Sequence, residues 1–123
     1  MPMAQKITHM FEPTPLQCGQ AVLSMLSGEP VDKIISIVKT ERETTLADMK
    51  NALRVLGIGF CDIRLPVCDK NKLPKTAILS LETPHCWHWS LYRNGKFYDP
   101  EYGLLDDFPP SNRRYYWEIT EDE

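Results

Sequence analysis

Cys18 stands where a thiol can act as a nucleophile, at the start of an amphipathic segment that follows Pro13 and Pro15. The spacing predicts a helix that begins near Gln17, so Cys18 falls in its first turn. Unpaired backbone N–H groups and the helix dipole stabilise an anion there, and the thiolate is the reactive form of cysteine. Because Cys18 also lies on the apolar stripe of this helix, packing in the core is the alternative interpretation.

A predicted β-hairpin supplies two further polar groups. Asn94-Gly95 lies between aromatic strand segments and favours a two-residue turn. The resulting register pairs Ser90 with Asp99 and makes His88 and Asp99 diagonal neighbours on one face, about 7 to 8 Å apart at Cα. An imidazole and a carboxylate so placed can hydrogen-bond, which leaves the second ring nitrogen for a thiol. We therefore consider Cys18, His88 and Asp99 as nucleophile, base and orienting acid.

Length and composition indicate a single domain over residues 1–123. The chain is 42% hydrophobic, which is enough for a core, and its net charge of −3 argues against nucleic acid as the main partner. Because the sequence has neither a long apolar run nor a secretion signal, we expect a cytoplasmic chain without a membrane span. The four cysteines form no CxxC pair and are expected to be reduced thiols.

Three short helices are predicted in the first half of the chain. Residues 1–12 are expected to lie extended ahead of the cysteine helix, which Gly28 ends. Pro30 opens a second amphipathic helix. Thr45 and Asp48 resemble a capping box at the start of a third.

Strands are predicted in the second half of the chain. A strand-like segment covers 58–65, and the apolar run 77–81 suits a central strand buried on both sides. The hairpin arms and a last strand over 115–120 complete the set. A polar loop is expected over 69–75 and irregular structure after Pro100.

Several short motifs between residues 7 and 102 point to one enzyme family. They are Pro13-Thr14-Pro15-x-x-Cys18-Gly19-Gln20-Ala21, Thr44-Thr45-Leu46, His88-Trp89 and Tyr98-Asp99-Pro100. Together they resemble the bacterial papain-like cysteine peptidases related to the double-glycine leader peptidases. The resemblance implies an α+β, papain-like fold in which the N-terminal cysteine helix packs against a C-terminal antiparallel sheet. It also implies a thiol hydrolase of peptides or proteins that needs no cofactor or metal, with Cys18, His88 and Asp99 as its triad.

Glu12 departs from that family pattern. The family has a glutamine six residues before the cysteine, whose amide helps to bind the oxyanion, so the resemblance places Glu12 in the oxyanion site. An ionised carboxylate would repel the developing charge, and loss of one donor costs about 10² to 10³ in rate. Gln17 or Thr14 could substitute, alongside the backbone N–H of Cys18. The alternative function is a catalytically impaired domain that binds a peptide or protein in its cleft.

Two other hypotheses follow from His85 and the remaining cysteines. His85 could replace His88 as the base in a transglutaminase-like or deamidase-like acyl transferase. A metal site could instead draw on the two histidines together with Cys61, Cys68 and Cys86. Their spacing does not match common zinc ligand pairs, so we interpret these three cysteines as packing residues.

Overall fold

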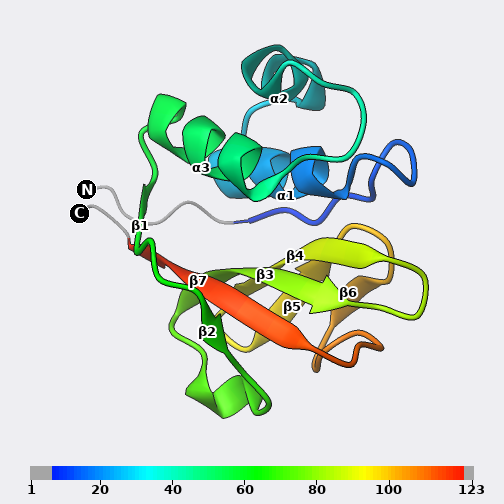
Figure 1. Cartoon of the computed structure of the whole chain (residues 1–123), viewed down its shortest axis with the longest axis vertical. Coiled ribbons are helices and arrows are strands. Elements are labelled where there is room, and N and C mark those ends of the chain that lie inside the picture. The colour runs from blue at the N-terminus through cyan, green and yellow to red at the C-terminus, as the bar shows by residue number, and fades with distance from the viewer. Residues whose placement is uncertain (1–6, 121–123) are drawn as a thin grey trace.

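The computed structural model describes residues 7–120, in which three helices pack on one face of an antiparallel sheet (Figure 1). The helices are α1 (Cys18–Ser27), α2 (Val31–Val38) and α3 (Leu46–Val55), and a short 3₁₀ turn, η1, covers Lys70–Lys72. The strands are β1 (Gly59–Phe60), β2 (Leu65–Pro66), β3 (Thr76–Glu82), β4 (Trp87–Arg93), β5 (Lys96–Asp99), β6 (Gly103–Leu105) and β7 (Arg114–Thr120). The predicted α+β class is confirmed at this level.

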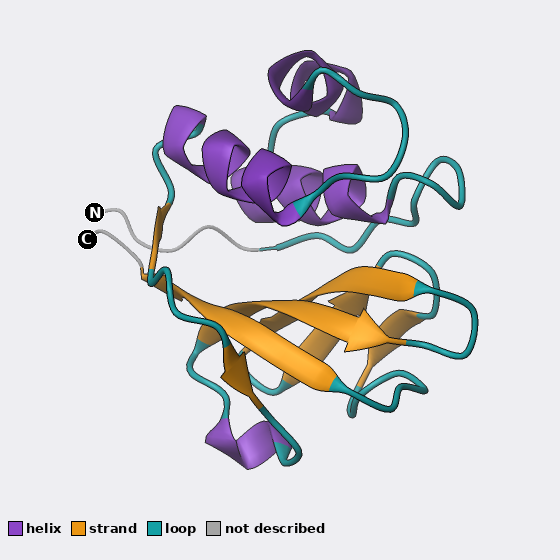
Figure 2. Cartoon of the chain, in the orientation of Figure 1, coloured by secondary structure: helices purple, strands orange, loops and turns teal. Residues whose placement is uncertain are grey.

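The sheet has the order β1-β7-β3-β4-β5-β6, and the short β2 also pairs with β7 (Figure 2). β3 lies between β4 and β7, and most of its side chains are buried, as predicted for a central strand. The last strand therefore returns to the middle of the sheet instead of extending its edge. This arrangement leaves β4 and β5 beside each other with the register that the hairpin turn sets.

Local sequence signals account for the helix ends. Gly28 adopts φ 80° at the end of α1, a left-handed conformation that glycine reaches without steric cost. α2 follows Pro30. Thr45 Oγ1 accepts the Asp48 N–H at 3.1 Å while the Asp48 carboxylate accepts the Thr45 N–H at 2.9 Å, so the predicted capping box is confirmed.

Three predictions of regular structure were wrong in detail. The segment 58–65 is not one strand, because within it only Gly59–Phe60 and Leu65 pair with β7. The chain between them holds Asp62, which forms salt bridges to α3. Irregular structure after Pro100 is interrupted by β6, a three-residue strand that exists through its pairing with β5. The polar loop 69–75 contains η1, which Asp69 caps.

Two apolar clusters lie on opposite faces of the sheet. The larger one fills the space between helices and sheet and contains Ile7, Val22, Leu23, Met25, Ile34, Val38, Met49, Ala52, Leu53, Ile78, Leu91 and Ile119. The smaller one contains Ala77, Leu79, Leu81, Tyr92 and Phe97, with Phe108 and Leu105 against it. Residues 7–12 carry no helix or strand, as predicted, and residues 1–6 of that stretch lie outside the described range.

Two properties bear on the wider class of the protein. No helix within residues 7–120 has the length and apolar character needed to cross a bilayer. All four cysteines are free thiols, as their spacing predicted.

Candidate active site

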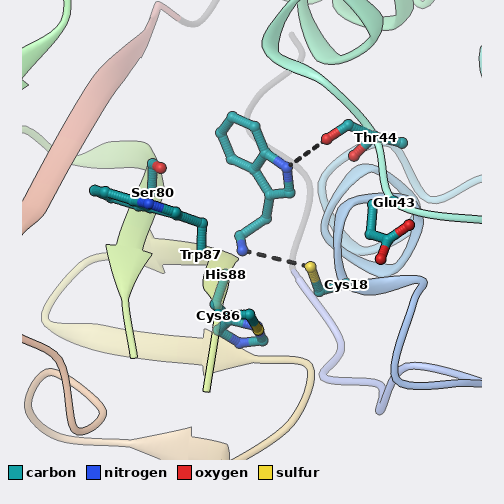
Figure 3. A pocket seen from close by; sticks show the side chains of 8 residues that line it. Cys18, Glu43, Thr44, Ser80, Cys86, Trp87 and His88 are labelled. Atoms are coloured by element: carbon teal, nitrogen blue, oxygen red, sulfur yellow. Dashed lines mark hydrogen bonds between the residues drawn. The ribbon is translucent and has the colours of Figure 1, made fainter. Parts of the chain in front are cut away.

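Cys18 is the first residue of α1, and its sulfur points toward the start of β4 (Figure 3). The backbone N–H of Trp89 donates to Sγ at 3.5 Å. The residue before the helix, Gln17, makes no side-chain cap hydrogen bond to the N–H groups of the first turn. The thiol is partly exposed and is held beside an electropositive helix end.

Gly19 allows this helix start to pack closely against the chain before α3. A Cβ at this position would lie 2.0 Å from Thr44 Oγ1, which is far inside contact distance. A steric requirement, separate from the chemistry of the thiol, therefore explains why glycine follows Cys18.

The hairpin that carries the other two residues has the predicted turn. Asn94 and Gly95 both have positive φ values, 49° and 87°, as a type I′ turn requires. Arg93 pairs with Lys96, and the same register brings His88 Nε2 to 2.9 Å from Asp99 Oδ1.

Asp99 is fully buried and held by several donors. Ser90 Oγ donates to Oδ2 at 2.8 Å, and the backbone N–H groups of Glu101 and Tyr102 donate to Oδ1 at 2.8 and 2.9 Å. Burial alone would raise the pKa of Asp99, but the His88 hydrogen bond and charge and the two N–H donors hold it below its ordinary value. The carboxylate is thus ionised at neutral pH and fixed in orientation.

His88 is 3% exposed and lies between Asp99 and the Cys18 sulfur. Burial favours the neutral ring, yet hydrogen bonds to Asp99 and Cys18, together with their charges, raise the pKa of His88 to about 10. The ring is therefore an imidazolium at neutral pH. Asp99 takes Nε2, whereas Nδ1 has the Glu101 carboxylate at 3.9 Å, which is longer than a hydrogen bond.

The sulfur and the imidazole meet even though they belong to different layers. Trp89 and Leu91 pack in the core on the helix side, so strand alternation turns His88 toward the other face of the sheet with Ser90. Cys18 still reaches the ring because it begins its helix next to the start of β4, where the Trp89 N–H contacts Sγ.

Glu12 joins this group from the chain that leads into α1. Its N–H donates to the Pro100 carbonyl at 2.8 Å, directly beyond Asp99. Three atoms able to bind a metal, a Glu12 carboxylate oxygen, the Cys18 sulfur and a His88 ring nitrogen, lie within 4.8 Å of one another. Burial raises the pKa of Glu12 from 4.5 to about 7, while the His88 cation opposes this rise. Within residues 7–120, Glu12 Oε1 is buried without a hydrogen-bond partner.

Other residues considered from the sequence lie elsewhere. The Gln17 side chain is buried and donates to the Glu41 carbonyl at 3.1 Å, so its amide is directed to the chain before α3 and not to an oxyanion. Thr14 Oγ1 accepts the Leu16 N–H in a local turn. His85 is exposed on the connection between β3 and β4. We therefore drop Gln17 from the oxyanion site.

Metal-binding residue types gather at one place only in the part of the chain that the structure describes, and this place is Glu12, Cys18 and His88. The hypothetical set of His85 and His88 with Cys61, Cys68 and Cys86 is not among such groups there. Cys68 and Cys86 are exposed, and Cys61 is partly buried.

A pocket of about 320 Å³ opens beside the sulfur. Its lining comprises Cys18, Glu43, Thr44, Ser80, Cys86, Trp87, His88 and Trp89 (Figure 3). Trp89 Nε1 donates to the Thr44 carbonyl at 3.2 Å, which ties β4 to the chain before α3 and closes one side.

Sequence reasoning missed three contributors to the site. Glu43 lies on the charged connection between α2 and α3, and no local pattern places it at a pocket. His9 Nε2 lies 2.7 Å from the Asp99 carbonyl, a contact across 90 residues that has no sequence signal. Ser90 could have been found, because the predicted register sets it opposite Asp99.

A comparison of the sequence with protein-family models found no match, and a comparison with curated proteins found none either. The geometry of the site is therefore the basis for a proposed function.

Proposed function

We propose that this chain is a papain-like cysteine hydrolase that cleaves peptide or amide bonds through an acyl-enzyme on Cys18. The observation that carries the proposal is a series of contacts from the Cys18 sulfur at the helix start to the buried His88 imidazole and on to the buried Asp99 carboxylate. His88 Nε2 lies 2.9 Å from Asp99 Oδ1. A cysteine helix packed on an antiparallel sheet that bears the histidine and the acid is also the arrangement that the resemblance implies.

The residues can perform both halves of such a reaction. The Cys18 thiolate attacks the carbonyl carbon, a C–S bond forms, and the carbonyl electrons move to oxygen. The His88 imidazolium then protonates the leaving nitrogen as the C–N bond breaks. In the second half the neutral ring takes a proton from water, which attacks the thioester and releases the acid and the thiolate. Asp99 keeps the ring in one orientation throughout.

The oxyanion needs donors beside the sulfur. The backbone N–H of Cys18 lies in the first turn of α1, where N–H groups have no partner within the helix. Glu12 in its acid form can donate an O–H from Oε1 or Oε2, and its raised pKa makes this form available near neutral pH. A protonated carboxyl in an apolar site is an established type of oxyanion donor.

A peptide-binding domain without turnover is the second candidate function, and one observation favours it. An ionised Glu12 within 4.8 Å of the reacting atoms would repel the oxyanion. Because the pocket and its aromatic walls would persist, such a protein could still hold a peptide.

Trapping the acyl-enzyme tests the proposal. The reduced protein is incubated with thioesters of short peptides at about pH 6, and the mass gained by each cysteine peptide is read by mass spectrometry. We expect a stoichiometric acyl group on Cys18, its loss in Cys18→Ala and its retention in Cys68→Ala. Acylation spread over Cys68 and Cys86, or absent while the peptide still binds, would contradict the hydrolase and favour the binding domain.

A further inference from the structure

Three donors of different chemical type converge at the candidate site from separate parts of the chain. They are the Glu12 carboxylate from the lead-in, the Cys18 sulfur from α1 and the His88 imidazole from β4, with donor atoms within 4.8 Å of one another. Zinc takes thiolate, imidazole and carboxylate ligands at roughly 2.0 to 2.3 Å, so tetrahedral ligand atoms lie about 3.5 Å apart. The group would have to contract by only about an ångström to hold one ion.

The surroundings of His88 are those of a metal-binding histidine. Ring nitrogens that bind zinc belong to imidazoles whose other nitrogen is bonded to a carboxylate or a carbonyl, which fixes the ring and increases its basicity. Asp99 Oδ1 accepts from Nε2 at 2.9 Å, and Ser90 fixes Oδ2 at 2.8 Å. Nδ1, which has the Glu101 carboxylate at 3.9 Å but no hydrogen bond to it, is thereby the ring nitrogen that can bind an ion.

An independent observation at Glu12 points to a missing partner. Glu12 Oε1 is buried and has no hydrogen-bond partner among residues 7–120. A buried, unpaired carboxylate oxygen is costly, and a cation satisfies it. The backbone at Glu12 is also anchored, because its N–H donates to the Pro100 carbonyl at 2.8 Å, so the side chain starts from a fixed point.

We propose that Glu12, Cys18 and His88 bind one Zn²⁺ ion, with the fourth coordination position open to the adjoining pocket. Cys18 and His88 both line that pocket of about 320 Å³, which provides an entry path and room for water. The ion would bind the same Cys18 sulfur that would attack a substrate, so bound zinc reversibly blocks acylation of Cys18. Metal binding itself is independent of the proposed hydrolase, whereas the inhibition rests on it.

Titration of the full chain with Co²⁺ and Zn²⁺ tests the site, with protein that has been freed of metal and reduced by a phosphine. We expect one ion per chain, a sulfur-to-cobalt charge-transfer band, and displacement of cobalt by zinc. Glu12→Gln keeps the shape of the side chain and should weaken zinc binding at least about tenfold, and Asp99→Asn should weaken it about 10- to 100-fold. Cys18→Ser should abolish the charge-transfer band.

Matched controls separate this site from adventitious binding. Glu43→Gln removes a pocket-lining carboxylate that is outside the group of three donors, and Cys68→Ala removes an exposed thiol, so neither should change the zinc affinity. Equal zinc affinity in Glu12→Gln and the parent, or a band that Cys68→Ala removes, would overturn the inference. Zinc binding without an acyl-enzyme would support the metal site and contradict the hydrolase, and an acyl-enzyme without one-to-one binding would do the reverse.

Discussion

Replacing Glu12 with glutamine should change how activity depends on pH. In the parent protein, the acid form of Glu12 donates to the oxyanion and the ionised form opposes it. Burial raises the pKa of Glu12 to about 7, so activity should fall as pH rises through 7. Glutamine donates through its amide at every pH. The pKa of about 10 for His88 then sets the next alkaline limit.

The size of this effect follows from the titration of one group. With a pKa of about 7, Glu12 is about 90% protonated at pH 6 and about 10% protonated at pH 8. We therefore expect kcat/KM of the parent to fall about tenfold between these two values, and by a further factor of ten for the next unit. Glu12→Gln should be within about a factor of three of the parent at pH 6 and about tenfold faster at pH 8.

The assay is hydrolysis of a peptide pool or of peptide thioesters from pH 5 to 10, with chelator present so that metal does not contribute. Glu43→Gln is the matched control, because its carboxylate lines the pocket but is outside the group of three donors. Superimposable profiles for Glu12→Gln and the parent, both active, would refute the role given to Glu12. If both proteins are folded and inert, the peptide-binding function is favoured instead.

Three further predictions follow from the same geometry. Asp99→Asn should lower kcat/KM by about 10² to 10⁴ and move the alkaline limit of activity, set by the His88 pKa, down from about 10. Asp107→Asn should change neither quantity. An unchanged alkaline limit in Asp99→Asn would contradict the pairing of His88 with Asp99. Glu12→Gln should raise the free energy of unfolding at pH 8, with a small effect at pH 5, because the raised pKa of Glu12 makes its ionisation costly only in the folded state. The gain should be about 1 to 2 kcal/mol, because water screens the partly exposed side chain. Equal changes at both pH values in denaturant titrations would disagree with this sign. Thr45→Ala should cost about 1 kcal/mol of stability through the lost cap, with unchanged thiol reactivity.

The parts of the site that sequence could predict are those with local causes. Asn94 and Gly95 favour one turn type, the turn sets the register, and the register places His88 near Asp99. The capping box at Thr45 depends on residues three apart and was equally readable. The start of α1 follows from prolines that prevent an earlier helix.

The parts that sequence could not predict depend on contacts between distant segments. Glu12 reaches the site because its backbone pairs with Pro100, and His9 adds a bond to the Asp99 carbonyl. Gln17 has the residue type expected of an oxyanion donor, but its amide finds Glu41, and nothing in the local pattern favours one direction. The short strand β6 likewise forms only because β5 offers it an edge.

The meeting of Cys18 with His88 was expected from the triad hypothesis, but no local sequence pattern causes it. Strand alternation alone places this imidazole on the face away from the helices. Contact arises because the helix begins beside the start of β4, which depends on how the helices are positioned on the sheet. The hairpin sequence therefore predicts that His88 and Asp99 are paired. The packing of α1 on the sheet decides whether that pair contacts the Cys18 sulfur.

Residue-resolved alkylation is the most direct test of an activated sulfur. The reduced protein, with chelator present, is treated briefly with iodoacetamide at about pH 6, where an ordinary thiol of pKa about 8.5 is almost entirely protonated. We predict that Cys18 reacts faster than Cys68 and Cys86, although these two are exposed and Cys18 is only partly so, and that His88→Ala removes this preference. Rates that follow exposure, or a Cys18 rate unchanged by His88→Ala, would contradict the account.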